Sequence, residues 1–185
     1  MTRGFTLLEV SVVMALLALI GLFLGQTYLD FSQFFGRENL QVDLNLANQN
    51  TLQDVSASVK ESAAVLASAV LDSITYTSAT TTLVLNLPTI NTQGQIVSGS
   101  YDTLAYYLDP ANQKKLVKRV QAAAGSRRQT QTKTLDSFVS FLEFQYNATS
   151  TADAAAIIMT LTSSQTQAGR LQAVTSTLRA VLRNK

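Results

Sequence analysis

The segment RGFTLLEV, residues 3–10, opens an apolar run that continues to Leu24. Counted from Phe5, the run has about 20 residues, which is the length that crosses the hydrocarbon core of a bilayer as a helix. The acidic side chain inside the run, Glu9, costs on the order of 2.5–3.5 kcal/mol at the centre of a membrane. We therefore expect a membrane-spanning helix in which Glu9 has a partner or a task.

Two simpler interpretations explain only part of this segment. A secretory signal peptide has a short apolar core followed by a cleavage site of small residues. The residues after Leu24, GQTYLD at 25–30, contain no clear site of this kind. A plain N-terminal anchor explains the length of the run but not the presence of Glu9.

The sequence GFTLLEV at residues 4–10 resembles the G-F-T-L-x-E start of type IV prepilins and type II secretion pseudopilins. The resemblance extends to about residue 30 and is looser beyond it. It implies that residues 1–4 are a leader, that a prepilin peptidase cuts between Gly4 and Phe5, and that the new amine of Phe5 is methylated. Glu9 then becomes the fifth residue of the mature chain, where the family carries its glutamate.

The same resemblance suggests a task for Glu9. In a filament, its carboxylate would pair with the Phe5 amine of a neighbouring subunit, because opposite charges attract strongly in a low-dielectric core. Glu9 would thereby set the register between subunits. The alternative is that Glu9 reaches the lipid headgroups, since it lies near the cytoplasmic end of the span. Arg3 precedes the span and predicts a cytoplasmic N-terminus.

Composition narrows the possible functions. The 185 residues suffice for one anchor and one modest domain, and the formal charge of +2 does not by itself indicate nucleic-acid binding. The chain has no His and no Cys. This excludes Ser-His-Asp and Cys-His catalysis, zinc sites built from His or Cys, and disulfides. We expect no enzyme activity, no cofactor and no metal site.

Helical periodicity continues beyond the apolar run. Gly21 and Gly25 form a G-x-x-x-G spacing, which lets two membrane helices approach closely, weakens the helix locally, or arises by chance in a run of small residues. Apolar residues then recur at steps of three and four. They are Leu40, Leu44, Ala47, Leu52, Val55, Val59, Ala63, Leu66 and Val70. We expect one helix from Phe5 to Asp72, with residues 5–29 in the membrane, residues 30–72 outside it and a bend at Gly36.

The pattern changes to β structure after Asp72. Residues 73–185 are rich in β-branched residues and turns, and they predict a β-rich globular domain. We expect strands in the following ranges: 75–77, 80–87, 101–108, 115–120, 137–146, 154–162 and 171–182. Pro88 should end the second of them, and residues 91–99, 122–134 and 163–169 should be loops or turns. The expected fold class is α+β, a long helix packed on an antiparallel sheet, similar to the pilin roll.

Between Asp109 and Asp136 the sequence has basic residues and no acidic one. They are Lys114, Lys115, Lys118, Arg119, Arg127, Arg128 and Lys133. Such a stretch could bind DNA or an acidic partner subunit, but charge runs are more often solvated, and no aromatic residues are interleaved here. Asp102 and Asp109 flank one predicted strand and lie seven positions apart, so they should point to opposite faces and make a poor metal or acid–base pair.

Taken with the resemblance, these patterns predict a structural subunit of a type IV filament. The missing disulfide and the sheet-rich domain favour a minor pilin or a J-like pseudopilin over a major pilin. The expected partners are other pilin or pseudopilin subunits, the prepilin peptidase and an inner-membrane assembly platform. The expected location is the bacterial inner membrane as a single-pass protein, then a periplasmic or cell-surface filament. A DNA-receptor pilin and an anchored domain of unknown binding role are the alternatives.

Overall fold

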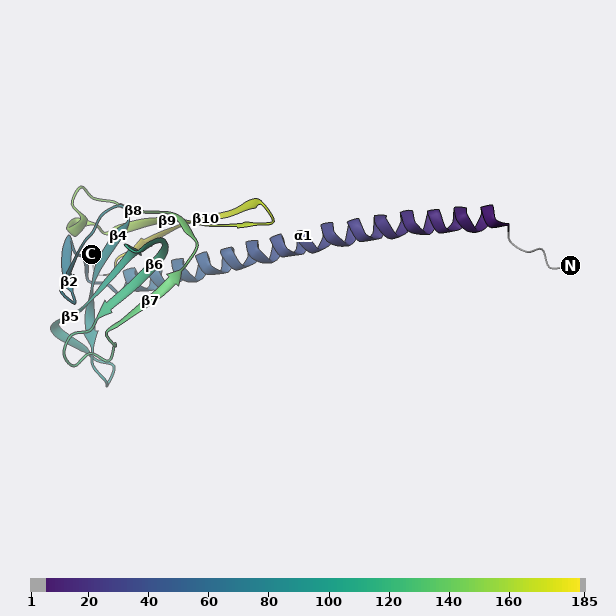
Figure 1. Cartoon of the computed structure of the whole chain (residues 1–185). Coiled ribbons are helices and arrows are strands. Elements are labelled where there is room, and N and C mark those ends of the chain that lie inside the picture. The colour runs from purple at the N-terminus through teal and green to yellow at the C-terminus, as the bar shows by residue number, and fades with distance from the viewer. Residues whose placement is uncertain (1–5, 184–185) are drawn as a thin grey trace.

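One helix and a group of strands make up the chain (Figure 1). The structure, a computed structural model, describes residues 6–183. Helix α1 runs from Leu7 to Glu61 without interruption. Its first half projects away from the strands, and its second half lies among them (Figure 1). The expected α+β class is therefore confirmed. Helix α1 continues through Gly36, so the helix does not break at the residue where we expect a bend.

Helix α1 ends earlier than its periodicity predicted. The residue after it, Ser62, has an extended backbone, with φ −71° and ψ 144°, and its hydroxyl donates to the carbonyl of Val59 at 2.7 Å. Strand β1, Ala64–Val65, then pairs with strand β4, Thr82–Ile90. Much of the range 63–72 thus forms strands instead of helix, because pairing with distant strands overrides a weak local helix preference.

The strands form three antiparallel sheets. The five-stranded sheet has the order β1-β4-β5-β6-β7, the three-stranded sheet β10-β9-β8, and the two-stranded sheet β2-β3. The bounds of the remaining strands are β2 Ser68–Leu71, β3 Ile74–Thr77, β5 Ile96–Asp109, β6 Asn112–Gln121, β7 Gln131–Asp136, β8 Val139–Tyr146, β9 Ala156–Gln167 and β10 Arg170–Val181.

Several predicted loops are strands in the structure. Strand β4 passes through Pro88, where the register with β5 shifts between Pro88 and Ile90. Strand β7 occupies the end of the predicted loop 122–134 and pairs with β6. The predicted turn 163–169 is mostly strand β9, and only Ala168 and Gly169 turn the chain. In each case a neighbouring strand satisfies the backbone of a polar segment that has little strand preference of its own.

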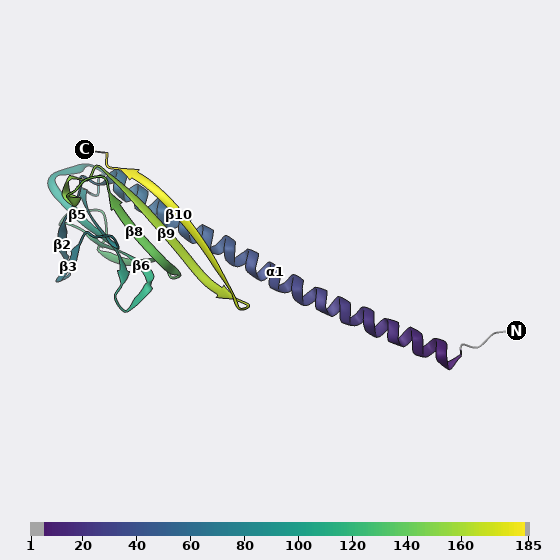
Figure 2. The same ribbon diagram turned by 90° about the horizontal axis from the view of Figure 1, so that it is seen from above.

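The second half of α1 and both larger sheets share one hydrophobic core. Strands β9 and β10 form a long hairpin that lies along α1 (Figure 2). The core includes Val55 and Val59 of α1, Tyr106 of β5 and Phe144 of β8, each at most 1% exposed. The alternation of apolar residues in 171–182 predicts that Val174, Leu178, Ala180 and Leu182 face inward. Val174, Ala180 and Leu182 are buried, and Leu178 is half-buried against the core.

The face of α1 that packs on the sheets contains polar residues. Asn48 is a polar residue that the sequence alone places on the solvent face of the helix, but it is fully buried. Its amide nitrogen donates to the carbonyl of Val174 at 3.0 Å, and its oxygen accepts from the Ser163 hydroxyl at 2.6 Å. These bonds to β10 and β9 offset the cost of burying the amide.

Candidate functional site

The start of α1 is closed by a capping box. Thr6 is the N-cap, and its hydroxyl oxygen accepts from the backbone N–H of Glu9 at 3.3 Å. In return, Glu9 Oε2 accepts from the Thr6 N–H at 2.9 Å and from its hydroxyl at 3.1 Å. The sequence contains the signal for this cap as Thr-x-x-Glu before an apolar run, a motif that the sequence predictions above do not include. Gly4 and Phe5, the predicted cleavage and methylation residues, lie outside the described residues.

The first half of α1 makes almost no contact with the rest of the chain. Every residue from Thr6 to Phe35 is exposed, including large apolar side chains such as Leu17 and Phe23. This half is long and apolar enough to cross a membrane, and none of its most apolar window is buried. The two predicted packing glycines, Gly21 and Gly25, belong to it, and a Cβ added at either would meet no atom within 4 Å.

An exposed apolar stripe continues beyond residue 29. We define it by Tyr28, Phe31, Phe35, Val42 and Leu46, each at least 53% exposed. The steps of 3, 4, 7 and 4 residues place them on one side of the helix. Phe31 and Phe35 are in edge-to-face contact, with ring centroids 5.1 Å apart.

The apolar stripe lies opposite the face that packs on the sheets. At about 100° per residue, Val42 and Leu46 are each roughly 160–200° around the helix from Leu44. Leu44 is 1% exposed, whereas Leu46 is 56% exposed. One side of the second half of α1 is thus covered by the domain, and the other side presents apolar groups to whatever surrounds the chain.

Three of the predicted basic residues are paired with carboxylates. Lys118 Nζ lies 2.6 Å from Asp54 Oδ1 of α1, and Arg119 forms an ion pair with Asp72. Arg128 lies between two acids, with Nη1 at 2.7 Å from Asp102 and Nη2 at 3.1 Å from Glu61. The sequence alone does not identify these acids as partners, because they are distant from the basic residues along the chain.

Asp102 is the centre of the most buried of these pairs. Its side chain is 1% exposed and accepts from the Ala123 N–H at 2.8 Å, the Ser126 hydroxyl at 2.8 Å and Arg128 at 2.7 Å. Burial raises the pKa of this carboxyl, but the hydrogen bonds from Ala123, Arg128 and Ser126 outweigh burial, so its pKa lies below the ordinary value. Asp102 precedes Leu104 and Tyr106 at alternate positions of one strand, so the alternation places its side chain on the same buried face. A buried carboxylate there requires a cation.

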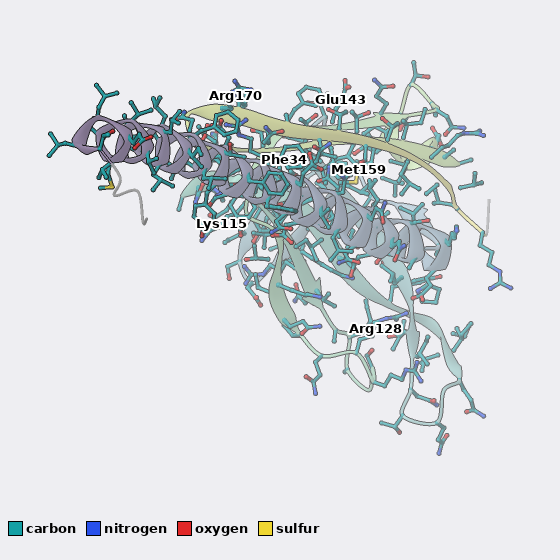
Figure 3. The ribbon with its side chains drawn as sticks, turned by 90° about the vertical axis from the view of Figure 1, so that its right-hand side faces the viewer. Phe34, Lys115, Arg128, Glu143, Met159 and Arg170 are labelled. Carbon is teal, nitrogen blue, oxygen red and sulfur yellow. The ribbon has the colours of Figure 1, made fainter. Side chains whose placement is uncertain are left out.

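The other four basic residues have no ion pair among residues 6–183. They are Lys114, Lys115, Arg127 and Lys133. Lys114 and Lys115 lie near the β5–β6 turn, whereas Arg127 lies in the loop that follows the far end of β6. Figure 3 shows Lys115 and Arg128 in separate parts of the domain. The seven cations therefore do not form one continuous patch, which favours the interpretation of local ion pairs and solvated side chains.

Other kinds of site have less support in the described part of the chain. No three of its Asp, Glu, His or Cys side chains lie together as metal ligands would. Among known proteins, no family model, curated protein or solved structure matches this chain. The capping box and the uncovered faces of α1 therefore carry the functional interpretation.

Proposed function

We propose that this chain is a membrane-anchored structural subunit of a type IV filament, of the minor pilin or pseudopilin kind. The observation that carries the proposal is the uncovered surface of α1. Its first half is exposed on all sides, and the apolar stripe prolongs that surface along the second half. Contiguous apolar surface of this extent needs a cover, and it marks a site for membrane or protein contact.

A membrane covers only part of this surface. Residues 5–29 fit a bilayer, but Val42 and Leu46 lie 13 and 17 residues beyond residue 29, or about 20–25 Å along the helix. That distance exceeds the roughly 5–7 Å of headgroup layer on each side of the hydrocarbon core. Packing of α1 against the helices of other copies would cover both parts, with the sheets remaining on the outer side.

The geometry of Glu9 suits a contact between subunits. Within the described residues, both side-chain hydrogen bonds that Glu9 accepts go to Oε2. Oε1 is therefore open to a donor from another chain, such as the amine that cleavage at Phe5 would create. The pseudopilin-like motif at residues 4–10 supports this pairing.

Processing and location follow from the same proposal. A prepilin peptidase would remove residues 1–4, and the chain would reside as a single-pass protein in the bacterial inner membrane. An assembly platform there would then transfer it, with other subunits, into a periplasmic or surface filament. In this assignment the chain has a structural task and no catalytic one.

The test of the proposal is processing. We would co-express the chain with a prepilin peptidase and measure the intact mass and N-terminal sequence of the product. The expected product begins at methylated Phe5, and Gly4→Ala blocks its formation. A product that still begins at Met1, or one cut after Leu24, would overturn the assignment.

A second pair of variants tests the role of Glu9 separately from helix capping. Glu9→Gln keeps a capping-box acceptor but removes the charge, whereas Glu9→Ala removes both. If Glu9 pairs with a neighbour's amine, both variants lose incorporation into filaments, as measured by co-purification with the assembled fibre. If Glu9→Gln assembles like the wild type, the charge has no such role.

A further inference from the structure

A cleft lies between the tip of the β9–β10 hairpin and α1, at the end of the predicted membrane span. It has a volume of about 610 Å³ and lies between α1 residues 27–37 and Arg170 of β10. Figure 3 shows Arg170 at the end of the hairpin, beside the part of α1 that carries Phe34. The membrane-spanning half of α1 and the globular domain come together at this cleft.

The hairpin tip is held close to the helix. A Cβ added to Gly36 would lie 2.8 Å from Nε2 of Gln167, so a glycine at this position leaves room for the Gln167 side chain. Ala168 and Gly169, with φ of 49° and 72°, form a two-residue turn, and Gln167 pairs with Arg170 across it. Arg170 is therefore positioned beside α1 by a tight turn.

The cleft carries more positive than negative charge, and its two cations form no ion pair with a described carboxylate. Neither Arg37 nor Arg170 forms an ion pair among residues 6–183. Arg37 donates from Nη2 to the side-chain oxygen of Gln33 at 3.3 Å, and its buried Nε has no hydrogen-bond partner. Asp30 also lines the cleft, so the walls have two positive charges and one negative charge.

The depth of the cleft matches that of lipid headgroups. Arg37 reaches back to Gln33, which lies four residues, or about 6 Å, beyond the end of the predicted span at residue 29. The headgroup layer is about 5–7 Å thick on each side of the core. Exposed Tyr28, Phe31 and Phe34 surround this level, as aromatic residues do at membrane interfaces.

We propose that this cleft binds the phosphate of an anionic membrane lipid through Arg37 and Arg170 while the chain resides in the membrane. A guanidinium group offers a planar pair of donors that fits phosphate oxygens. The inference rests on the membrane anchoring in the proposed function. It adds a lipid-binding role for the hairpin tip, which would orient the domain on the membrane surface.

The chain offers a clean reporter for this contact. It has no Trp, and Leu171 at the hairpin tip is 67% exposed, so Leu171→Trp places a single tryptophan, which can be excited selectively, beside Arg170. We would reconstitute the full chain into nanodiscs, one copy per disc. We would then compare quenching by headgroup-nitroxide phosphatidylglycerol with quenching by the same label on phosphatidylcholine. We expect stronger quenching by phosphatidylglycerol, decreasing with added salt.

Matched variants identify the cations. Arg170→Gln and Arg37→Gln should each lower the preference for phosphatidylglycerol about fivefold, the usual effect of one basic residue near an anionic surface. Arg179→Gln makes the same charge change on β10, nine residues from Arg170, and should have no effect. Asp30→Asn removes the negative charge from the cleft and should raise the preference.

The possible outcomes separate the two proposals. A chain that floats with vesicles but is quenched equally by both lipids overturns the headgroup site and leaves the filament proposal intact. Equal losses in Arg170→Gln and Arg179→Gln also overturn the site, because they would show an effect of net charge alone. A chain that does not float with vesicles overturns the anchor and both proposals.

Discussion

The two halves of α1 have the same backbone and opposite surroundings. All residues from Thr6 to Phe35 are exposed, whereas the part between Leu44 and Val59 has seven buried residues. The second half is held by sheets of its own chain, and the first half has only its cap and its internal hydrogen bonds. Most helical stability in proteins comes from packing. In the proposed function, a bilayer or another subunit supplies this packing for the first half.

The largest expected effect is on the domain side of this comparison. Arg128→Gln leaves the carboxylate of Asp102, which is 1% exposed, without its cation. Breaking a buried ion pair costs about 3–5 kcal/mol. We expect a decrease of that size in the free energy of unfolding, measured by urea titration of the full chain in mild detergent.

The control for this prediction is Arg127→Gln, one residue earlier, because Arg127 is exposed and has no ion pair among the described residues. It should change the free energy of unfolding by less than about 0.5 kcal/mol. Equal effects of the two substitutions would contradict the assignment of Arg128 as the partner of Asp102.

A second prediction compares two leucines on opposite sides of α1. Leu44→Ala opens a cavity at a site that is 1% exposed and should cost about 2–5 kcal/mol. Leu46→Ala removes the same atoms from a site that is 56% exposed and should cost less than about 0.5 kcal/mol. Both values come from the same urea titration.

In filament assembly, in contrast to unfolding, the exposed Leu46 should be the leucine that makes the contact. Leu46 belongs to the apolar stripe, so Leu46→Ala should reduce co-purification with the filament although the isolated chain is as stable as wild type. If Leu46→Ala assembles normally, another surface of α1 makes the contact between subunits.

The third prediction concerns pH. The pKa of Asp102 is lowered on folding by its hydrogen bonds to Ala123, Arg128 and Ser126, although burial opposes them. A group with a lowered pKa contributes stability that is fully present above its unfolded pKa, near 3.9, and is lost as the pH falls through its folded value. The free energy of unfolding should therefore decrease below about pH 4. In Asp102→Asn this part of the pH dependence should be absent.

The smallest effect is expected at the free end of α1. Thr6→Ala removes the N-cap hydroxyl that accepts from the Glu9 N–H and should cost the first turn about 1 kcal/mol. Hydrogen exchange at the amides of Glu9 and Val10 should become about fivefold faster in detergent. The unfolding of the domain should be unchanged, since no packed residue touches this turn. A shift in domain stability would show that the two halves are coupled.

Local sequence patterns were sufficient to predict the structural features that depend on short segments. The apolar run predicted an exposed helix long enough for a membrane, and Thr-x-x-Glu contained the signal for its cap. Alternation in 171–182 predicted the buried side of β10, including Val174 and Ala180. Each of these features follows from neighbours a few residues apart, so the sequence alone determines it.

Tertiary structure decided the features that join distant segments. The end of α1 at Glu61 follows from the pairing of Ala64 with Asn86, and the burial of Asn48 follows from contacts with β9 and β10. In the sequence Arg128 belongs to a basic stretch, whereas in the structure it lies 2.7 Å from Asp102, which is 26 residues away. The physical reason is that burial and pairing depend on which strands meet, and strand pairing over long separations overrides local preference.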